Sequence, residues 1–135
     1  MHADAIDHVN LAYPVDNLDA VIDFYVDSLG FSTEFENPHT AVQDDPGLFT
    51  ITLGNNCKLF VNPTDDFDSS NTNYRHMALR IPETPSAIRS RFDQANIQVE
   101  NTVERHRQSV GQYTSFYVQD PVGYTIECMA IGDGQ

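Results

Sequence analysis

The stretch DHVNLAYPVDNLDAVIDFYVDSLGF, residues 7–31, decides the fold of this chain. Its first part is strand-like, with His8, Asn10 and Ala12 alternating with Val9, Leu11 and Tyr13, and predicts a strand over residues 5–13 that Pro14 ends. Asp16 or Asn17 can then cap a helix, and apolar residues recur at helical spacing from Leu18 to Leu29, so a helix is predicted within residues 16–29. Gly30 follows as a typical helix stop. The stretch therefore predicts a strand followed directly by a helix.

The same pattern returns in the second half of the chain. His76 follows His8 by 76 − 8 = 68 residues, and the same offset superimposes Leu11 on Leu79, Pro14 on Pro82 and Phe24 on Phe92. One such unit cannot bury its sheet face alone, whereas two copies can do so together. The sequence therefore indicates a duplicated module with one histidine in each copy.

The remaining elements complete two βαβββ modules. The first covers residues 5–62 and the second residues 74–131, with a polar linker at residues 63–73. Residues 37–47 hold two prolines, a glycine and two aspartates, and residues 104–112 are mostly polar, so both segments are predicted as loops. The predicted fold class is α+β, with strands and helices in both modules.

Composition bounds the class of protein. A length of 135 residues suits one domain, residues 1–135, and the net charge of −13 argues against nucleic acid or an anionic membrane as a partner. No stretch approaches the roughly 20 apolar residues of a membrane helix, and the N-terminus lacks the pattern of a secretory signal. We therefore expect a cytoplasmic protein. For Cys57 and Cys128, free thiols are favoured over a disulfide.

His8, His76 and Glu127 are the candidate metal ligands, and each lies in a short strand-like segment. Two imidazoles and one carboxylate suit a divalent transition metal that keeps coordination positions open. Strand alternation places each of them on the face opposite the predicted helix. A single strand histidine is more often an ordinary core or surface residue, and Glu127 alone an exposed carboxylate. Two observations together favour a metal site. The repeat places one histidine in each copy, and an unpaired Glu127 carboxylate between apolar neighbours would cost free energy unless it were solvated or coordinated.

Four further residues are candidates for the same site. Arg80 alternates onto the face of His76 and suits either an anionic substrate group or a surface ion pair. Ser115 and Tyr117 share a face of their strand. We predict Ser115 as a substrate-binding residue, and Tyr117, with Glu127, as a catalytic one that hydrogen-bonds or protonates a substrate oxygen; Tyr117 is equally typical of a structural tyrosine. His106, in a predicted loop, is more often a solvated side chain, and the alternative is a mobile acid or base over the site.

The chain resembles the vicinal oxygen chelate superfamily, which includes glyoxalase I, extradiol dioxygenases, fosfomycin-resistance transferases and bleomycin-resistance proteins. The resemblance runs over residues 6–129 and is carried by residues 7–31 and by SFYVQDPVGYTIE, residues 115–127. It implies paired βαβββ modules whose mixed sheets curl into an open cup around one metal, with the helices outside. It also implies that the ligands are His8, His76 and Glu127, and that the protein is a homodimer. His8 could then join the other ligands within one chain or across the dimer.

The sequence departs from glyoxalase I at one ligand position. The fourth ligand of that enzyme would fall at Leu59 or Phe60, and neither side chain binds metal. The resemblance therefore implies one divalent ion per site (Fe, Mn, Ni or Zn) and a small-molecule substrate with adjacent oxygens. The implied enzyme is either a glyoxalase-like lyase or isomerase or a ring-cleaving dioxygenase. The alternative is a metal-free binding protein of the bleomycin-resistance type.

Overall fold

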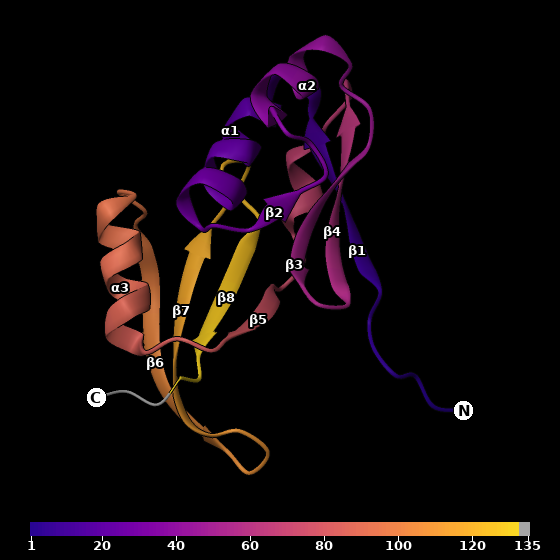
Figure 1. Ribbon diagram of the computed structural model, residues 1–135. Coiled ribbons are helices and arrows are strands. Elements are labelled where there is room, and N and C mark those ends of the chain that lie inside the picture. The colour runs from indigo at the N-terminus through magenta and orange to yellow at the C-terminus, as the bar shows by residue number, and fades with distance from the viewer. Residues whose placement is uncertain (133–135) are drawn as a thin grey trace. The chain divides into compact units, whose positions relative to one another are not determined.

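The computed structural model describes residues 1–132, and the chain divides into two compact units, Met1–Asn71 and Thr72–Gln135 (Figure 1). Each unit contains one four-stranded sheet. The sheet orders are β1-β4-β3-β2 and β5-β8-β7-β6, so both units place their first strand beside their fourth. In each sheet the first and fourth strands are parallel and the other pairs are antiparallel. The predicted α+β class with mixed sheets is confirmed, and neither sheet closes on itself.

The first unit follows the predicted strand and helix and adds a second helix. Its elements are β1 (His8–Pro14), η1 (Val15–Asn17), α1 (Leu18–Ile22), η2 (Asp23–Ser28), β2 (Ser32–Thr33), α2 (Pro38–Asp44), β3 (Phe49–Gly54), β4 (Cys57–Thr64) and the start of the short η3 (Ser69–Thr72). The helix predicted within residues 16–29 consists of a 3-10 turn, a short α-helix and a π-helix in succession, and Asn17, one of the two predicted caps, makes no side-chain capping hydrogen bond. It ends at Gly30, whose φ of 82° requires glycine-like freedom.

The loop prediction for residues 37–47 is wrong over α2. Pro38 stands at the start of the helix, where its missing N–H costs no hydrogen bond. Val42 is buried at 4% exposure, and the amide of Gln43 donates to Asp19 on α1 at 2.8 Å. Tertiary contacts to α1 therefore stabilise a helix whose composition alone is typical of a loop.

The second unit contains β5 (Met77–Ile81), α3 (Pro85–Gln94), β6 (Val99–Arg107), β7 (Gly111–Gln119) and β8 (Thr125–Ala130). Thr84 caps α3, because its hydroxyl oxygen accepts from the backbone N–H of Ala87 at 3.1 Å. The helix lies along the sheet (Figure 1), and its Phe92 ring meets Phe116 of β7 edge to face at 5.9 Å. The face of β7 and β8 that carries Phe116 is therefore the covered face.

The loop prediction for residues 104–112 holds only for the turn at residues 108–110 and is wrong over residues 104–107 and 111–112. β6 continues to Arg107 and β7 begins at Gly111, so these residues form the end of a hairpin whose pairing runs to Arg107 and Gly111. β6 is an edge strand that pairs with β7 alone, and most of its side chains are exposed. Polar and charged side chains are typical of such edges, and here they resemble loop composition.

A buried aspartate shapes the turn between β7 and β8. Asp120 is 4% exposed, and its Oδ1 accepts from the backbone N–H groups of Val122, Gly123 and Tyr124 at 3.1, 3.1 and 3.0 Å. Gly123 has a φ of 107°, which favours glycine. This turn fixes where β8 begins and therefore where Glu127 lies.

Both cysteines are free thiols, as expected from the sequence. Among the described residues, no helix has the length and apolar character needed to cross a bilayer.

Candidate functional site

Glu127 lies on the face of the second unit's sheet that α3 does not cover. It lies on β8, an inner strand between β5 and β7, and pairs with Ala78 and Tyr117. Because side chains alternate along a strand, it points away from the face that α3 covers. Its side chain is nevertheless buried, at 6% exposure. A buried carboxylate needs partners for its oxygens, since desolvation without them is costly.

Each oxygen of Glu127 has such a partner. The Nε2 atom of His76 lies 2.9 Å from Oε1, and the hydroxyl of Ser115 donates to Oε2 at 2.5 Å. Ser115, predicted above as a substrate-binding residue, is fully buried, so its hydroxyl is directed at the carboxylate. His76 keeps 36% of its side chain exposed. The fold therefore brings together three residues that the sequence singled out.

Tyr117 and Arg105 border this group. The Tyr117 ring stands edge-on to the His76 ring, with centroids 5.5 Å apart, and its hydroxyl oxygen accepts from the Arg105 guanidinium at 3.1 Å. That hydrogen bond raises the pKa of Arg105 above its ordinary value, and the charge of Glu127 contributes in the same direction. Sequence reasoning missed Arg105, because it lies in the segment that was predicted as a loop.

Arg80 and His106 occupy different faces of the sheet. Arg80 pairs with Met129, two positions beyond Glu127 on the same face, and it is exposed. His106 lies within β6 and pairs with Gln112, so it alternates onto the face opposite Arg105. The expectation of a mobile His106 in a loop is therefore wrong.

His8 lies in the first unit at the start of β1. Its Nδ1 is 2.8 Å from Asp7 Oδ2, and its ring stacks on Phe60 with centroids 4.0 Å apart and planes 7° from parallel. The hydrogen bond to His8 lowers the pKa of Asp7. A carboxylate on one imidazole nitrogen orients the ring and directs the lone pair of Nε2 outward, as metal-binding histidines require.

The spacing of His76 and Glu127 fits two ligands of one ion. Ligand atoms about 2.1 Å from a metal in octahedral geometry, where neighbouring ligands form about a right angle, lie about 3 Å apart. The observed separation of 2.9 Å between Nε2 and Oε1 is close to that value, and it is also an ordinary hydrogen-bond distance. Ser115 would then hold the second carboxylate oxygen, which is how neighbouring hydrogen bonds commonly orient metal ligands.

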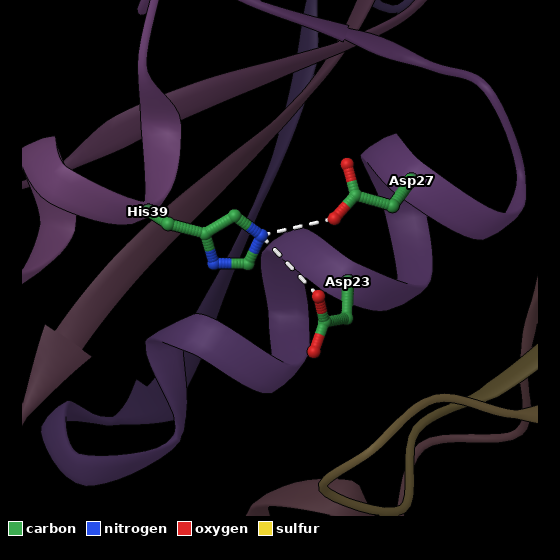
Figure 2. A group of neighbouring side chains, drawn as sticks. All are labelled: Asp23, Asp27 and His39. Atoms are coloured by element: carbon green, nitrogen blue, oxygen red, sulfur yellow. Dashed lines mark hydrogen bonds and ion pairs between the residues drawn. The ribbon is translucent and has the colours of Figure 1, made fainter.

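A second group of titratable side chains lies in the first unit (Figure 2). His39 Nε2 is 2.9 Å from Asp27 Oδ2 and 3.2 Å from Asp23 Oδ1, while its Nδ1 is 3.1 Å from Asp19 Oδ1. One ligand atom from each of Asp23, Asp27 and His39 lies within 4.8 Å of the others, a spacing that a metal ion also accepts. The group is a second possible ligand set, separate from the predicted one.

A protonated His39 also accounts for these contacts. Only the imidazolium donates from both nitrogens, and the hydrogen bonds to Asp27 and then Asp19 raise the pKa of His39. The cation joins α2 to the aspartates of α1 and η2 and offsets their mutual repulsion. The available sequence signal was the four-residue spacing of Asp19, Asp23 and Asp27, which places three carboxylates on one side of a helix.

The second unit also has an open hollow of about 530 Å³ beside α3. Its lining comes from α3 and from the α3-covered face of β6 and β7, and consists of Pro85, Ser86, Arg89, Thr102, Glu104, Thr114 and Phe116. These strand residues alternate away from Ser115, Tyr117 and Glu127. The hollow therefore does not open onto the carboxylate, and the chemistry lies on the other face.

Solved structures share this fold. A virulence protein from Salmonella typhimurium aligns over 96% of this chain and 98% of its own, with 24% identity and a TM-score of 0.69. A glyoxalase family protein from Enterococcus faecalis aligns over 93% and 97%, with 22% identity and a TM-score of 0.66. A lactoylglutathione lyase from Agrobacterium tumefaciens aligns over 96% and 95%, with 19% identity and a TM-score of 0.62. At these identities the likeness shows the fold alone.

The sequence itself identifies the family. A comparison with curated proteins finds no match. A family model matches residues 5–128, which is most of the chain and includes His8, His76 and Glu127. The chain therefore belongs to the Glyoxalase/Bleomycin resistance protein/Dioxygenase superfamily.

Proposed function

We propose that this protein is a metal-dependent enzyme that acts on a small molecule with adjacent oxygens. His76 and Glu127 would hold one divalent metal ion, with His8 as the third ligand from the same chain or from a homodimer partner. The observation that carries the proposal is the buried Glu127 carboxylate, held between Ser115 and His76 on the sheet face that α3 does not cover. Membership of the superfamily supports it.

The metal would supply a Lewis acid with open positions at which adjacent substrate oxygens bind. The protein's own side chains would orient the metal ligand Glu127 and donate a proton to the substrate. Ser115 fixes the orientation of the Glu127 carboxylate through its hydrogen bond to Oε2. Tyr117 accepts from Arg105, so its own phenolic proton is directed elsewhere and can be donated to a substrate oxygen. Tyr117 and Glu127 are therefore the proposed catalytic residues.

Two reaction classes fit these groups, a glyoxalase-like isomerisation or lyase reaction and an oxidative ring cleavage. A lactoylglutathione lyase shares the fold of this chain at 19% identity, which is in line with the lyase hypothesis. The fourth ligand of glyoxalase I would fall at Leu59 or Phe60; neither side chain binds metal, and the Phe60 ring stacks on His8. Three protein ligands leave more open positions on the metal than four, which favours the dioxygenase hypothesis.

A homodimer and a cytoplasmic location remain predictions.

Reconstitution with single metals tests the proposal. Metal-stripped protein is loaded anaerobically with Fe(II), Mn(II), Ni(II) or Zn(II), then assayed with catechol and oxygen and with a thiol–aldehyde adduct. We expect turnover with at least one metal, lost in Glu127→Gln and His76→Gln and kept in His39→Gln. If every loaded form is inactive while a cationic ligand binds equally well to wild type and His76→Gln, the metal-free binding protein is the correct reading.

A further inference from the structure

We propose that Tyr74 is a positioning residue for the proposed metal ligands His76 and Glu127. It links the segment that carries His76 to the first residue of β8, the strand that carries Glu127. The inference rests on the proposed function, because it concerns how two ligands of the same site are held. Tyr74 acts through the backbone, and no contact with the metal or the substrate is assigned to it.

His76 lies just outside the regular part of its sheet. The pairing of β5 with β8 begins at Met77 and Ile126, so His76 precedes the first paired residue of its strand. Within residues 1–132, none of the backbone hydrogen bonds outside helices and strands involves residues 73–76. Glu127, by contrast, lies on an inner strand that is paired on both sides. Strand pairing therefore holds His76 from its C-terminal side alone.

Tyr74 supplies an anchor on the N-terminal side of His76. Its hydroxyl donates to the backbone carbonyl of Thr125, the first residue of β8, at 2.9 Å. Arg75 and His76 are the two residues between this anchor and the paired Met77. Two residues span at most about 7 Å, so fixing both ends leaves the backbone of His76 little freedom.

The Tyr74 ring packs on a neighbour that is itself fixed. It meets the Tyr124 ring edge to face, with centroids 5.4 Å apart and planes at 90°. Tyr124 is 1% exposed, its backbone N–H donates to Asp120 Oδ1 at 3.0 Å, and its carbonyl accepts from the Asp120 N–H at 2.8 Å. Tyr74 is therefore attached to the same turn that fixes where β8 begins.

The hydrogen bond from Tyr74 to Thr125 relates the two ligands to each other. Tyr74 precedes His76 by two residues, and Thr125 precedes Glu127 by two residues. The contact of 2.9 Å between His76 Nε2 and Glu127 Oε1 thus lies two residues beyond this hydrogen bond on both segments. A metal site accepts ligand distances only within about 0.2 Å of their preferred values. Loosening the segment before β5 should therefore weaken metal binding although both ligands are still present.

The first test requires no metal and follows His76 directly. Tyr74→Phe removes the hydroxyl and keeps the ring, and backbone ¹⁵N relaxation is measured on metal-stripped protein. We expect the order parameter of His76 to fall from about 0.85, typical of a rigid backbone, toward about 0.6. Tyr13→Phe is the matched control, because it removes a tyrosine hydroxyl that hydrogen-bonds Tyr25 in the first unit. An order parameter of His76 that is equal in wild type and Tyr74→Phe overturns the proposal, and so does an equal fall in both variants.

The second test measures zinc affinity by competition with a chromophoric chelator. We expect Tyr74→Phe to bind zinc about tenfold more weakly than wild type, the lower end of the loss usual for a residue behind a metal ligand, and Tyr13→Phe to bind as wild type does. The visible spectrum of cobalt(II)-loaded Tyr74→Phe should shift toward that of His76→Gln, since the imidazole is held less well. Zinc affinities of wild type and Tyr74→Phe within about twofold overturn the proposal. If wild type binds neither ion, the proposed function fails, and the relaxation measurement alone decides whether Tyr74 positions His76.

Discussion

Removing the Ser115 hydroxyl should weaken metal binding without unfolding the protein. Ser115 is fully buried, and its hydroxyl donates to Glu127 Oε2 at 2.5 Å. In Ser115→Ala one oxygen of the proposed ligand loses the hydrogen bond that orients it. The carboxylate then samples orientations that do not favour the metal.

The expected loss of metal affinity follows from the one hydrogen bond between Ser115 and Glu127. A hydrogen bond to a charged group contributes about 1.5–3 kcal/mol. Each 1.4 kcal/mol corresponds to about a tenfold change in affinity, so the expected loss is about 10- to 100-fold. This agrees with the loss of about 10- to 100-fold that is usual when a partner behind a metal ligand is removed.

Competition with a chromophoric chelator measures the zinc affinity of wild type and Ser115→Ala. Thr114→Ala is the matched control, because Thr114 is the neighbouring residue on β7 and alternates onto the α3-covered face. Circular dichroism establishes that all three proteins are folded at the assay temperature. If Ser115→Ala is folded and binds zinc within about twofold of wild type, the hydrogen bond does not position a metal ligand.

Three further predictions concern other contacts. Asp120→Ala should lower the free energy of unfolding by about 3 kcal/mol in urea, because three turn N–H groups lose their acceptor; a change below about 0.5 kcal/mol would contradict this. His39 has a raised pKa, so its stabilising contribution is complete below its ordinary value of 6.5 and is lost as the pH rises through the folded-state value. His39→Gln should therefore cost about 0.5–1 kcal/mol near pH 5.5 and little near pH 9, and an equal cost at both pH values would exclude the ion pair. Burial raises the pKa of Cys128 to about 12, so native protein at pH 8 should be alkylated by iodoacetamide at the half-exposed Cys57 and not at Cys128, as peptide mass mapping would report.

Periodicity predicted the helices and strands that bury a regular face. The helix within residues 16–29 follows this rule, since apolar spacing is a local property. α2 was missed because its stability comes from contacts to α1 that only the folded chain provides. The outer half of β6 was missed because an edge strand exposes polar side chains as a loop does.

In the candidate site, too, local patterns could be predicted from the sequence, whereas contacts between different elements could not. Alternation correctly placed Ser115, Tyr117 and Glu127 on one face, since side chains repeat every second residue in a strand. Arg105 could not be found in this way, because its role depends on the pairing of β6 with β7. The aspartates around His39 are spaced for one helix side, but their partner lies on another element, α2.

The most direct test of the central claim is metal content per chain after anaerobic purification, compared between wild type, Glu127→Gln and His39→Gln. We expect about one divalent transition metal ion per chain in wild type and in His39→Gln, and a much lower metal content in Glu127→Gln. Metal that persists in Glu127→Gln but disappears in His39→Gln would contradict the account and place the ion at Asp23, Asp27 and His39 instead.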